Sequence, residues 1–109
     1  MALATEQAES QAKGLLDSYK AGQWETLRKS FDERMLVALS EELLAQTDAS
    51  ITDQVGELIS NGEPSTKSSG EHLVVDIPLE FERGQLKFRV SLDASGKVSG
   101  LFLLNPEVA

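Results

Sequence analysis

Few residues in this sequence could carry acid–base chemistry, and they are scattered: Asp17, Tyr19, Asp32, His72 and Asp76. An acid–base enzyme holds such groups in an apolar pocket, where burial shifts a pKa. Asp17 and Tyr19 are two residues apart on a predicted helix, so their side chains point to different sides. Tyr19 belongs to an apolar stripe, and His72 falls on the polar side of a predicted strand. Because no convincing catalytic set results, we expect a protein that is not an enzyme.

Metal and cofactor sites have equally little support. The sequence has no Cys and a single His, which excludes Cys-based zinc and iron–sulfur sites and multi-histidine sites within one chain. Asp76, Glu80 and Glu82 share one strand face and could bind Ca²⁺. Such a row is more typical of a solvated surface, here paired across the hairpin with Lys87 or Arg89. The glycines match no phosphate-binding pattern, and the nucleophile pattern G-x-S-x-G is absent. We therefore expect no metal and no cofactor.

The charge balance limits the partners that the protein can have. Ten Lys and Arg residues stand against 18 Asp and Glu, a net charge of −8, and Arg28-Lys29 is the only adjacent basic pair. Nucleic acid is therefore not expected as a partner, because it requires basic clusters. No stretch approaches the roughly 20 apolar residues of a membrane-spanning helix, so no membrane insertion is expected. The first residues lack the basic and apolar regions of a signal peptide, which leaves a cytoplasmic protein or a mature exported domain as alternatives.

The first half of the chain has the 3.6-residue periodicity of amphipathic helices. A stripe predicts a helix over 5–21, carried by Ala8, Ala12, Leu15, Leu16 and Tyr19. Apolar residues then predict a short second helix over 24–31 and an apolar connector over 35–39. Ser40, a favourable N-cap, begins a third helix that continues to about residue 60.

The period changes to two after Gly62, which is typical of strands. Alternating residues predict strands over 73–82, 86–92 and 97–104, with a weaker strand over 62–69. Helices over about 5–60 followed by an antiparallel meander of about four strands over 62–104 indicate an α+β fold in one domain, residues 1–109. Strict alternation along the last strand puts Val98, Gly100 and Phe102 on one face, and Leu101 and Leu103 on the other, open face.

Several short segments together resemble a known family. They are Ala21-Gly22-Gln23-Trp24, Phe31-Asp32, Met35, Leu39 to Leu44, Val55-Gly56, Leu58, Val74 to Gly84, Gly96 to Leu101, and Pro106. Over roughly residues 10–106 they are similar to the domain of unknown function 3887. That family usually carries one aromatic residue within its third helix and another after the following glycine. This sequence has Thr47-Asp48 and Glu57-Leu58 there.

The resemblance implies a nuclear-transport-factor-2-like cone, in which about three helices pack on a curved antiparallel sheet around a cavity. The family is bacterial, often extracytoplasmic, and often precedes an α/β-hydrolase domain, which would then be a partner. Its biochemical role is unassigned. The wider superfamily contains both small-substrate enzymes and catalytically silent modules, so the fold alone does not decide the function.

Three hypotheses follow. The first is a non-catalytic binding or accessory module that holds a small apolar ligand or a partner domain, with its contacts drawn from Tyr19, Trp24, Phe31, Phe88 and Phe102. The second is a small enzyme of the isomerase or dehydratase type that uses a buried Asp together with Tyr19. The third is a homodimer formed through the open face of the sheet, with contacts from Val74, Leu101 and Leu103.

Overall fold

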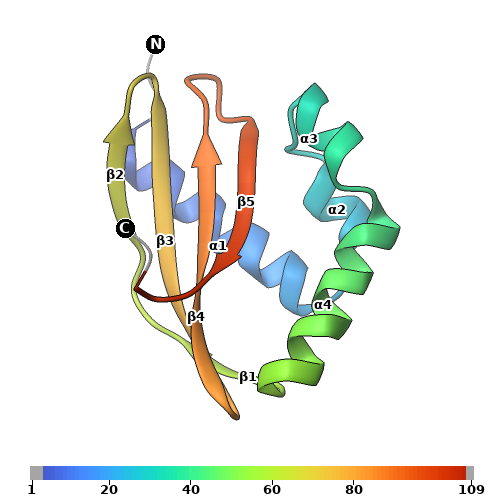
Figure 1. Cartoon of the computed structure of the whole chain (residues 1–109). Coiled ribbons are helices and arrows are strands. Elements are labelled where there is room, and N and C mark those ends of the chain that lie inside the picture. Colours follow the sequence, from blue (N-terminus) through green and yellow to red (C-terminus); the bar gives the residue numbers. More distant parts are fainter. Residues whose placement is uncertain (1–3, 108–109) are drawn as a thin grey trace.

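The computed structural model describes residues 4–107, and in them helices precede an antiparallel sheet (Figure 1). This arrangement confirms the α+β class predicted from the sequence. The described part contains four helices, one more than predicted, and five strands. Their bounds are α1 (Thr5–Lys20), α2 (Trp24–Arg28), α3 (Glu33–Ala38), α4 (Glu41–Val55), β1 (Leu58–Asn61), β2 (Ser65–Ser69), β3 (His72–Phe81), β4 (Gly84–Leu92) and β5 (Val98–Leu104).

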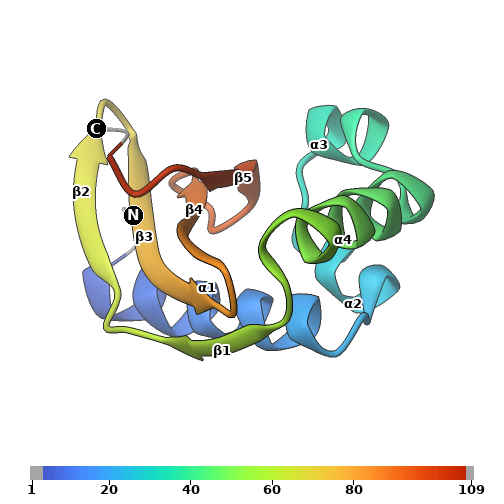
Figure 2. The same cartoon turned by 60° about the horizontal axis from the view of Figure 1, so that its bottom comes forward.

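Helix α1 lies across one face of the sheet, and its apolar stripe forms one side of the core (Figures 1 and 2). All five residues of the predicted stripe are buried. They pack against buried residues of β3 and β4, among them Val75, Ile77, Phe88 and Val90. Gly22 follows the helix with a φ of 69°, a left-handed conformation that ends a helix at little cost for glycine. We call the face of the sheet that packs on α1 the covered face, and the opposite face the open face.

The region after α1 differs from the prediction of one short helix and a connector. The second helix ends at Arg28, and Phe31 instead lies beside Val98 in a short parallel bridge. The carboxylate of Asp32 accepts a hydrogen bond from the Met35 amide at 2.8 Å, so Asp32 is the N-cap of α3. The predicted connector over 35–39 is therefore mostly helix, because the Asp32 cap begins a new helix just before it.

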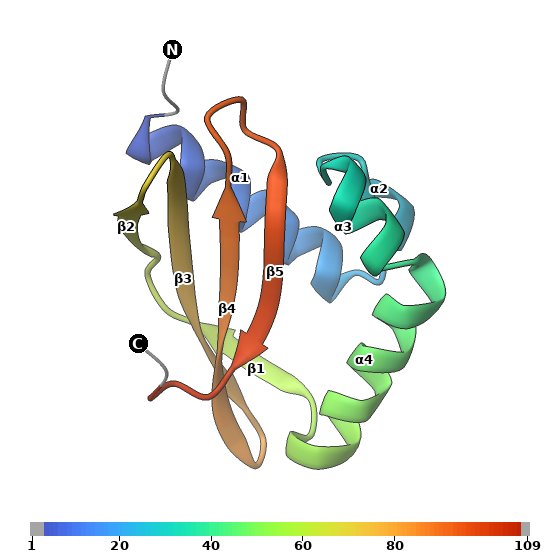
Figure 3. The ribbon, with the colours of Figure 1, turned by 45° about the horizontal axis from the view of Figure 1, so that its top comes forward.

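Helix α4 is shorter than predicted and lies apart from the sheet (Figure 3). Ser40 is its N-cap, as expected, and its hydroxyl accepts from the Leu43 amide. The helix ends at Val55 because Gly56 adopts a φ of 84°. The next apolar residues, which begin with Leu58, form β1 instead of continuing the helix. Helices α2, α3 and α4 lie beyond the β5 side of the sheet (Figure 1).

Strand β3 is the hub of the sheet, whose order is β1-β3-β4-β5 with β2 also paired to β3. The partner along one edge of β3 changes midway, because β2 pairs with residues 72–76 and β1 with residues 79–81. Pro78 lies between these two stretches. Since proline has no N–H to donate, it fits a place where the ladder is interrupted. The prediction of an edge position or a bulge for Pro78 holds only in part, because β3 is a central strand whose pairing with β4 is regular and Pro78 lies at the gap between its other two partners.

A bulge in β5 overturns the predicted faces of the last strand. Leu92 pairs with Val98, but the preceding residue, Ser91, pairs with Gly100, so Ser99 is an extra residue in β5. The bulge shifts every later side chain to the other face. Leu101 lies opposite Val90 and Leu103 opposite Phe88, both on the covered face, whereas Phe102 lies opposite Arg89 on the open face.

Candidate functional site

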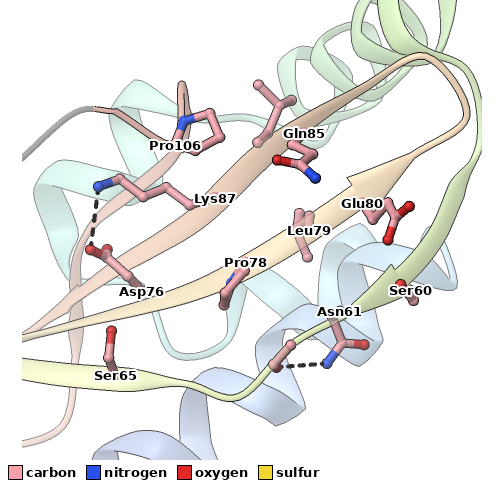
Figure 4. Close-up of a pocket in the computed structure, with 12 residues that line it drawn as sticks. Ser60, Asn61, Ser65, Asp76, Pro78, Leu79, Glu80, Gln85, Lys87 and Pro106 are labelled. Carbon is pink, nitrogen blue, oxygen red and sulfur yellow. Dashed lines mark hydrogen bonds and ion pairs between the residues drawn. The ribbon is translucent and has the colours of Figure 1, made fainter.

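One hollow is a groove of about 500 Å³ on the open face of the sheet (Figure 4). It lies among β1, the start of β2, the middle of β3, the start of β4 and the C-terminal tail. Its lining residues are Ser60, Asn61, Gly62, Ser65, Asp76, Pro78, Leu79, Glu80, Gln85, Leu86, Lys87 and Pro106. The tail after β5 crosses the open face toward β2, which brings Pro106 to the groove (Figure 1).

The charges beside this groove neutralise one another. Arg89 lies opposite Asp76 and donates to both of its carboxylate oxygens, at 2.7 and 2.9 Å. The Lys87 ammonium lies 3.6 Å from the same carboxylate. The hydrogen bonds from Arg89, helped by the charge of Lys87, hold the pKa of Asp76 below its usual range. This pairing agrees with the interpretation of the carboxylate row as a surface paired across the hairpin, and it leaves Asp76 committed to its neighbours.

A second hollow, which we call the inner cavity, has a volume of about 230 Å³ and opens between α4 and the sheet. It exists because α4 stands away from β5. Its lining residues are Tyr19, Leu39, Leu44, Thr47, Phe88, Leu101, Phe102, Leu103 and Leu104. Apart from Tyr19 and Thr47, all of these are Leu or Phe. The inner cavity therefore offers an apolar surface with two hydroxyl groups.

Tyr19 is fixed between two other aromatic rings. Its ring centroid lies 5.5 Å from that of Trp24, in an edge-on arrangement, and 5.9 Å from that of Phe88. The Tyr19 side chain is 6% exposed. Its hydroxyl is the only buried side-chain N or O atom among residues 4–107 that forms no hydrogen bond. A buried polar group without a partner costs about 1–3 kcal/mol, so this hydroxyl needs an explanation.

The same tyrosine lines a third hollow of about 240 Å³, on the side of α4 that leads to β1. We call it the polar hollow. It is lined by Tyr19, Lys20, Asp48, Thr52, Glu57, Leu58 and Phe81. Burial raises the pKa of the Tyr19 phenol above its ordinary value, and the nearby Asp48 carboxylate raises it further. The phenol is therefore neutral at every physiological pH and keeps its proton for donation.

The structure brings together some of the predicted contact residues and separates others. Tyr19 and Phe88 line the inner cavity, and Phe102 borders it because β5 is the edge strand of the sheet. Trp24 is not among the lining residues, but it supports the Tyr19 ring from behind. Phe31 is buried beside the start of β5 and does not reach the cavity.

The predicted dimer contacts do not share one face. Val74 lies opposite Ser91, on the open face, whereas Leu101 and Leu103 line the inner cavity on the other side of the sheet. The prediction that grouped the three residues is wrong, because it assumed regular alternation through the bulge at Ser99. The exposed apolar side chain that β5 presents on the open face is that of Phe102, which is 50% exposed.

Sequence reasoning missed Asp48 as a neighbour of Tyr19. Asp17, the acid considered with Tyr19, is exposed on α1. Asp48 lies on α4, 29 positions away, and comes close to Tyr19 only because the end of α1 and the middle of α4 border the same hollow. The sequence carries no direct signal of this contact, because it depends on how α4 is placed relative to the end of α1.

Two other observations limit the chemistry of the described part. His, Asp and Glu side chains of residues 4–107 do not gather in groups of three or more that could hold a metal ion. None of the helices between these residues has the length and hydropathy of a membrane-spanning segment.

Comparison with known proteins places this chain in a family. Among solved structures, it is similar to a protein from Ruminococcus gnavus ATCC 29149 determined by NMR, with a TM-score of 0.70 and 16% sequence identity. The similarity covers 92% of this chain and 90% of that one, and at this identity it shows a shared fold. No curated protein sequence matches the chain significantly. Residues 12–101 match the family model described as protein of unknown function (DUF3887), so the chain belongs to that family.

Proposed function

We propose that this domain is a binding module that holds a small, mostly apolar molecule in the inner cavity. The observation that carries the proposal is the apolar hollow between α4 and the sheet, lined almost entirely by Leu and Phe. Apolar surface of this kind is costly to leave in contact with water, by roughly 25 cal/mol per Å². A bound apolar molecule would remove that cost. Concave apolar sites with a few polar groups are the usual form of small-molecule sites.

The construction of the cavity also supports a binding role. Its floor is rigid, because Phe88 is fully buried in the central strands and Tyr19 is held between two rings. Its outer wall is α4, which has one buried residue, Leu44. A fixed floor and a lightly held wall would let a ligand enter without disrupting the core.

The same arrangement supports assignment to the nuclear-transport-factor-2-like superfamily, whose members enclose a cavity between helices and a curved sheet. The assignment is part of the proposal, because fold similarity does not transfer an activity. The larger groove on the open face is a weaker candidate for the ligand site. Its central carboxylate, Asp76, is already paired with Lys87 and Arg89.

Native mass spectrometry of gently purified protein tests the proposal. We expect a mass above that of the chain, which denaturation removes, and an apolar compound in an organic extract of the sample. The variant Thr47→Trp places a large ring at the cavity wall and should abolish the retained mass. The matched control is Gln46→Trp, at the adjacent exposed position that does not line the cavity. A bare wild-type mass, together with equal extracts from both variants, would contradict a binding role.

A second candidate function is supported by the Tyr19 and Asp48 pair. A neutral phenol beside a carboxylate supplies a proton donor and a base, the minimum set for an isomerase or dehydratase. In this hypothesis Asp48, and not Asp17, is the aspartate that works with Tyr19. Turnover of a ligand identified by extraction, lost in both Tyr19→Phe and Asp48→Asn, would favour the enzyme. Unchanged ligand after prolonged incubation would favour the binding module.

A further inference from the structure

The Tyr19 hydroxyl indicates what kind of molecule the inner cavity accepts. We propose that the ligand is an uncharged molecule with an apolar body and one carbonyl or hydroxyl oxygen, and that this oxygen meets the Tyr19 hydroxyl. This inference rests on the proposed function, since it takes the inner cavity to be a ligand site. It adds the chemical class of the ligand and the residue that selects it.

The need for an oxygen atom follows from the state of Tyr19. The side chain is more than nine-tenths buried, and its hydroxyl forms no hydrogen bond within residues 4–107. Aromatic neighbours on both sides restrict the ring, so the hydroxyl cannot turn outward to water without losing those contacts. Asp48 is close enough to raise the pKa of the phenol by its charge and by side-chain hydrogen bonding, yet no hydrogen bond of ordinary geometry satisfies the Tyr19 hydroxyl. A ligand oxygen inside the cavity would supply the missing partner.

The need for an uncharged molecule follows from the other walls. None of the nine lining residues of the inner cavity carries a charge. A carboxylate or ammonium group placed there would be removed from water without a counter-ion, at a cost of several kcal/mol. An anion at Tyr19 would also be repelled by Asp48, which lies on the adjoining side of the ring together with Glu57. Lys20 is in the polar hollow and does not line the inner cavity.

The size of the cavity limits the body of the ligand. A volume of about 230 Å³ corresponds to roughly seven or eight water molecules at about 30 Å³ each. A molecule with a single ring and a short substituent fits this space, whereas a long acyl chain would have to project past α4. The neutral state of the phenol supports the donor role, because burial and Asp48 both raise its pKa.

Three probes of nearly identical size and shape test the inference: acetophenone, cumene and benzoate. They differ in carrying an uncharged oxygen, no oxygen or a negative charge. Binding is measured by titration of isotope-labelled protein in two-dimensional amide NMR, with the Leu101 and Leu103 amides as reporters of the inner cavity. We expect acetophenone to bind about three- to tenfold more tightly than cumene, the gain of one net hydrogen bond. Benzoate should bind at least tenfold more weakly than acetophenone.

Two variants assign the preference to a residue. Tyr19→Phe should lower the affinity for acetophenone to or below that for cumene, because the carbonyl then has no donor, and leave cumene binding unchanged. Thr47→Val, which removes the other hydroxyl of the lining while keeping its shape, should preserve the preference. Equal binding of acetophenone and cumene in the wild type, or tighter binding of benzoate, would overturn the inference but leave the cavity as a binding site. If no probe shifts these amides, the proposed function fails together with the inference.

Discussion

Arg89 lies directly opposite Asp76 across β3 and β4, and its guanidinium donates one hydrogen bond to each oxygen of that carboxylate, at 2.7 and 2.9 Å. On the open face, few apolar contacts hold β3 and β4 in register. The contact between Arg89 and Asp76 fixes their register there. Because the carboxylate is about four-fifths buried, the pair is shielded from solvent more than an ordinary surface ion pair.

Asp76→Asn should therefore lower the free energy of unfolding at pH 7 by about 1 kcal/mol. The pKa of Asp76 is lower in the folded protein than in the unfolded chain, so this contribution is present above about pH 4 and is lost as the pH falls further. Urea denaturation at pH 7 and at about pH 2.5 measures the difference between variant and wild type. That difference should shrink at the lower pH.

The matched control is Glu80→Gln, an exposed carboxylate on the same strand and face, which should change stability little at either pH. An effect of Asp76→Asn that is independent of pH would contradict the assignment to the ion pair.

Gly56 marks the end of α4 for a steric reason, and replacing it should be costly. Its φ is 84°, and a Cβ there would lie 2.8 Å from the Cβ of Glu82. Gly56→Ala should lower the free energy of unfolding by about 1–3 kcal/mol. Gly14→Ala is the control, because Gly14 is inside α1 with open space around it. That variant should raise the free energy by about 0.5–1 kcal/mol, as the helix propensity of alanine requires. Thermal unfolding of both variants gives the comparison, and equal signs would contradict it.

The contrast between Gly56 and Gly14 shows where the sequence alone is enough to predict the secondary structure and where it is not. Periodicity predicts α1 and the three long strands because each buries a continuous face against the rest of the core. It fails at Leu58, which keeps the helical spacing of α4. The helix ends at Gly56, whose positive φ and closeness to Glu82 depend on segments far apart in the sequence.

The candidate site was less predictable for the same reason. Tyr19 and Phe88 could be named from the sequence as aromatic residues of core-facing elements. Leu101 and Leu103 could not be placed, because one extra residue at Ser99 reverses the faces of β5 and leaves no signal in composition. The position of Asp48 beside Tyr19 depends on the angle at which α4 leaves the sheet, which side-chain periodicity does not specify.

That angle is controlled in part by Arg28. Its guanidinium donates from Nε to the Leu39 carbonyl at 2.9 Å and from Nη2 to the Leu36 carbonyl at 2.8 Å. Both carbonyls lie at the end of α3, so the contact ties the α3–α4 connection to α2. Arg28→Ala should lower the free energy of unfolding by about 1–2 kcal/mol. Amides of α3 and α4 should exchange with deuterium faster than in the wild type. The exchange rates of β3 and β4 amides should rise only as much as the lower stability of the whole domain requires.

The matched control is Arg34→Ala, which removes an exposed guanidinium from α3 itself and should stay within about 0.5 kcal/mol of the wild type. Uniformly faster exchange across all elements of Arg28→Ala would show that Arg28 stabilises the whole domain and not the position of α4 in particular.

The buried phenol of Tyr19 gives a direct optical test of the inner cavity, because it is the one tyrosine of the chain. Burial, and then the charge of Asp48, raises its pKa in the folded state above the value of about 10 expected in the unfolded chain. The unfolded chain therefore releases this proton first as the pH rises, so folding stability should fall above about pH 10. The phenolate absorption band should stay absent while circular dichroism shows a folded protein, and it should appear together with unfolding. Asp48→Asn should bring the band to a lower pH, since it removes the charge that opposes ionisation. A phenolate band near pH 10 in a folded protein would mean that the Tyr19 hydroxyl reaches water. The hydroxyl would then need no ligand oxygen as a hydrogen-bond partner.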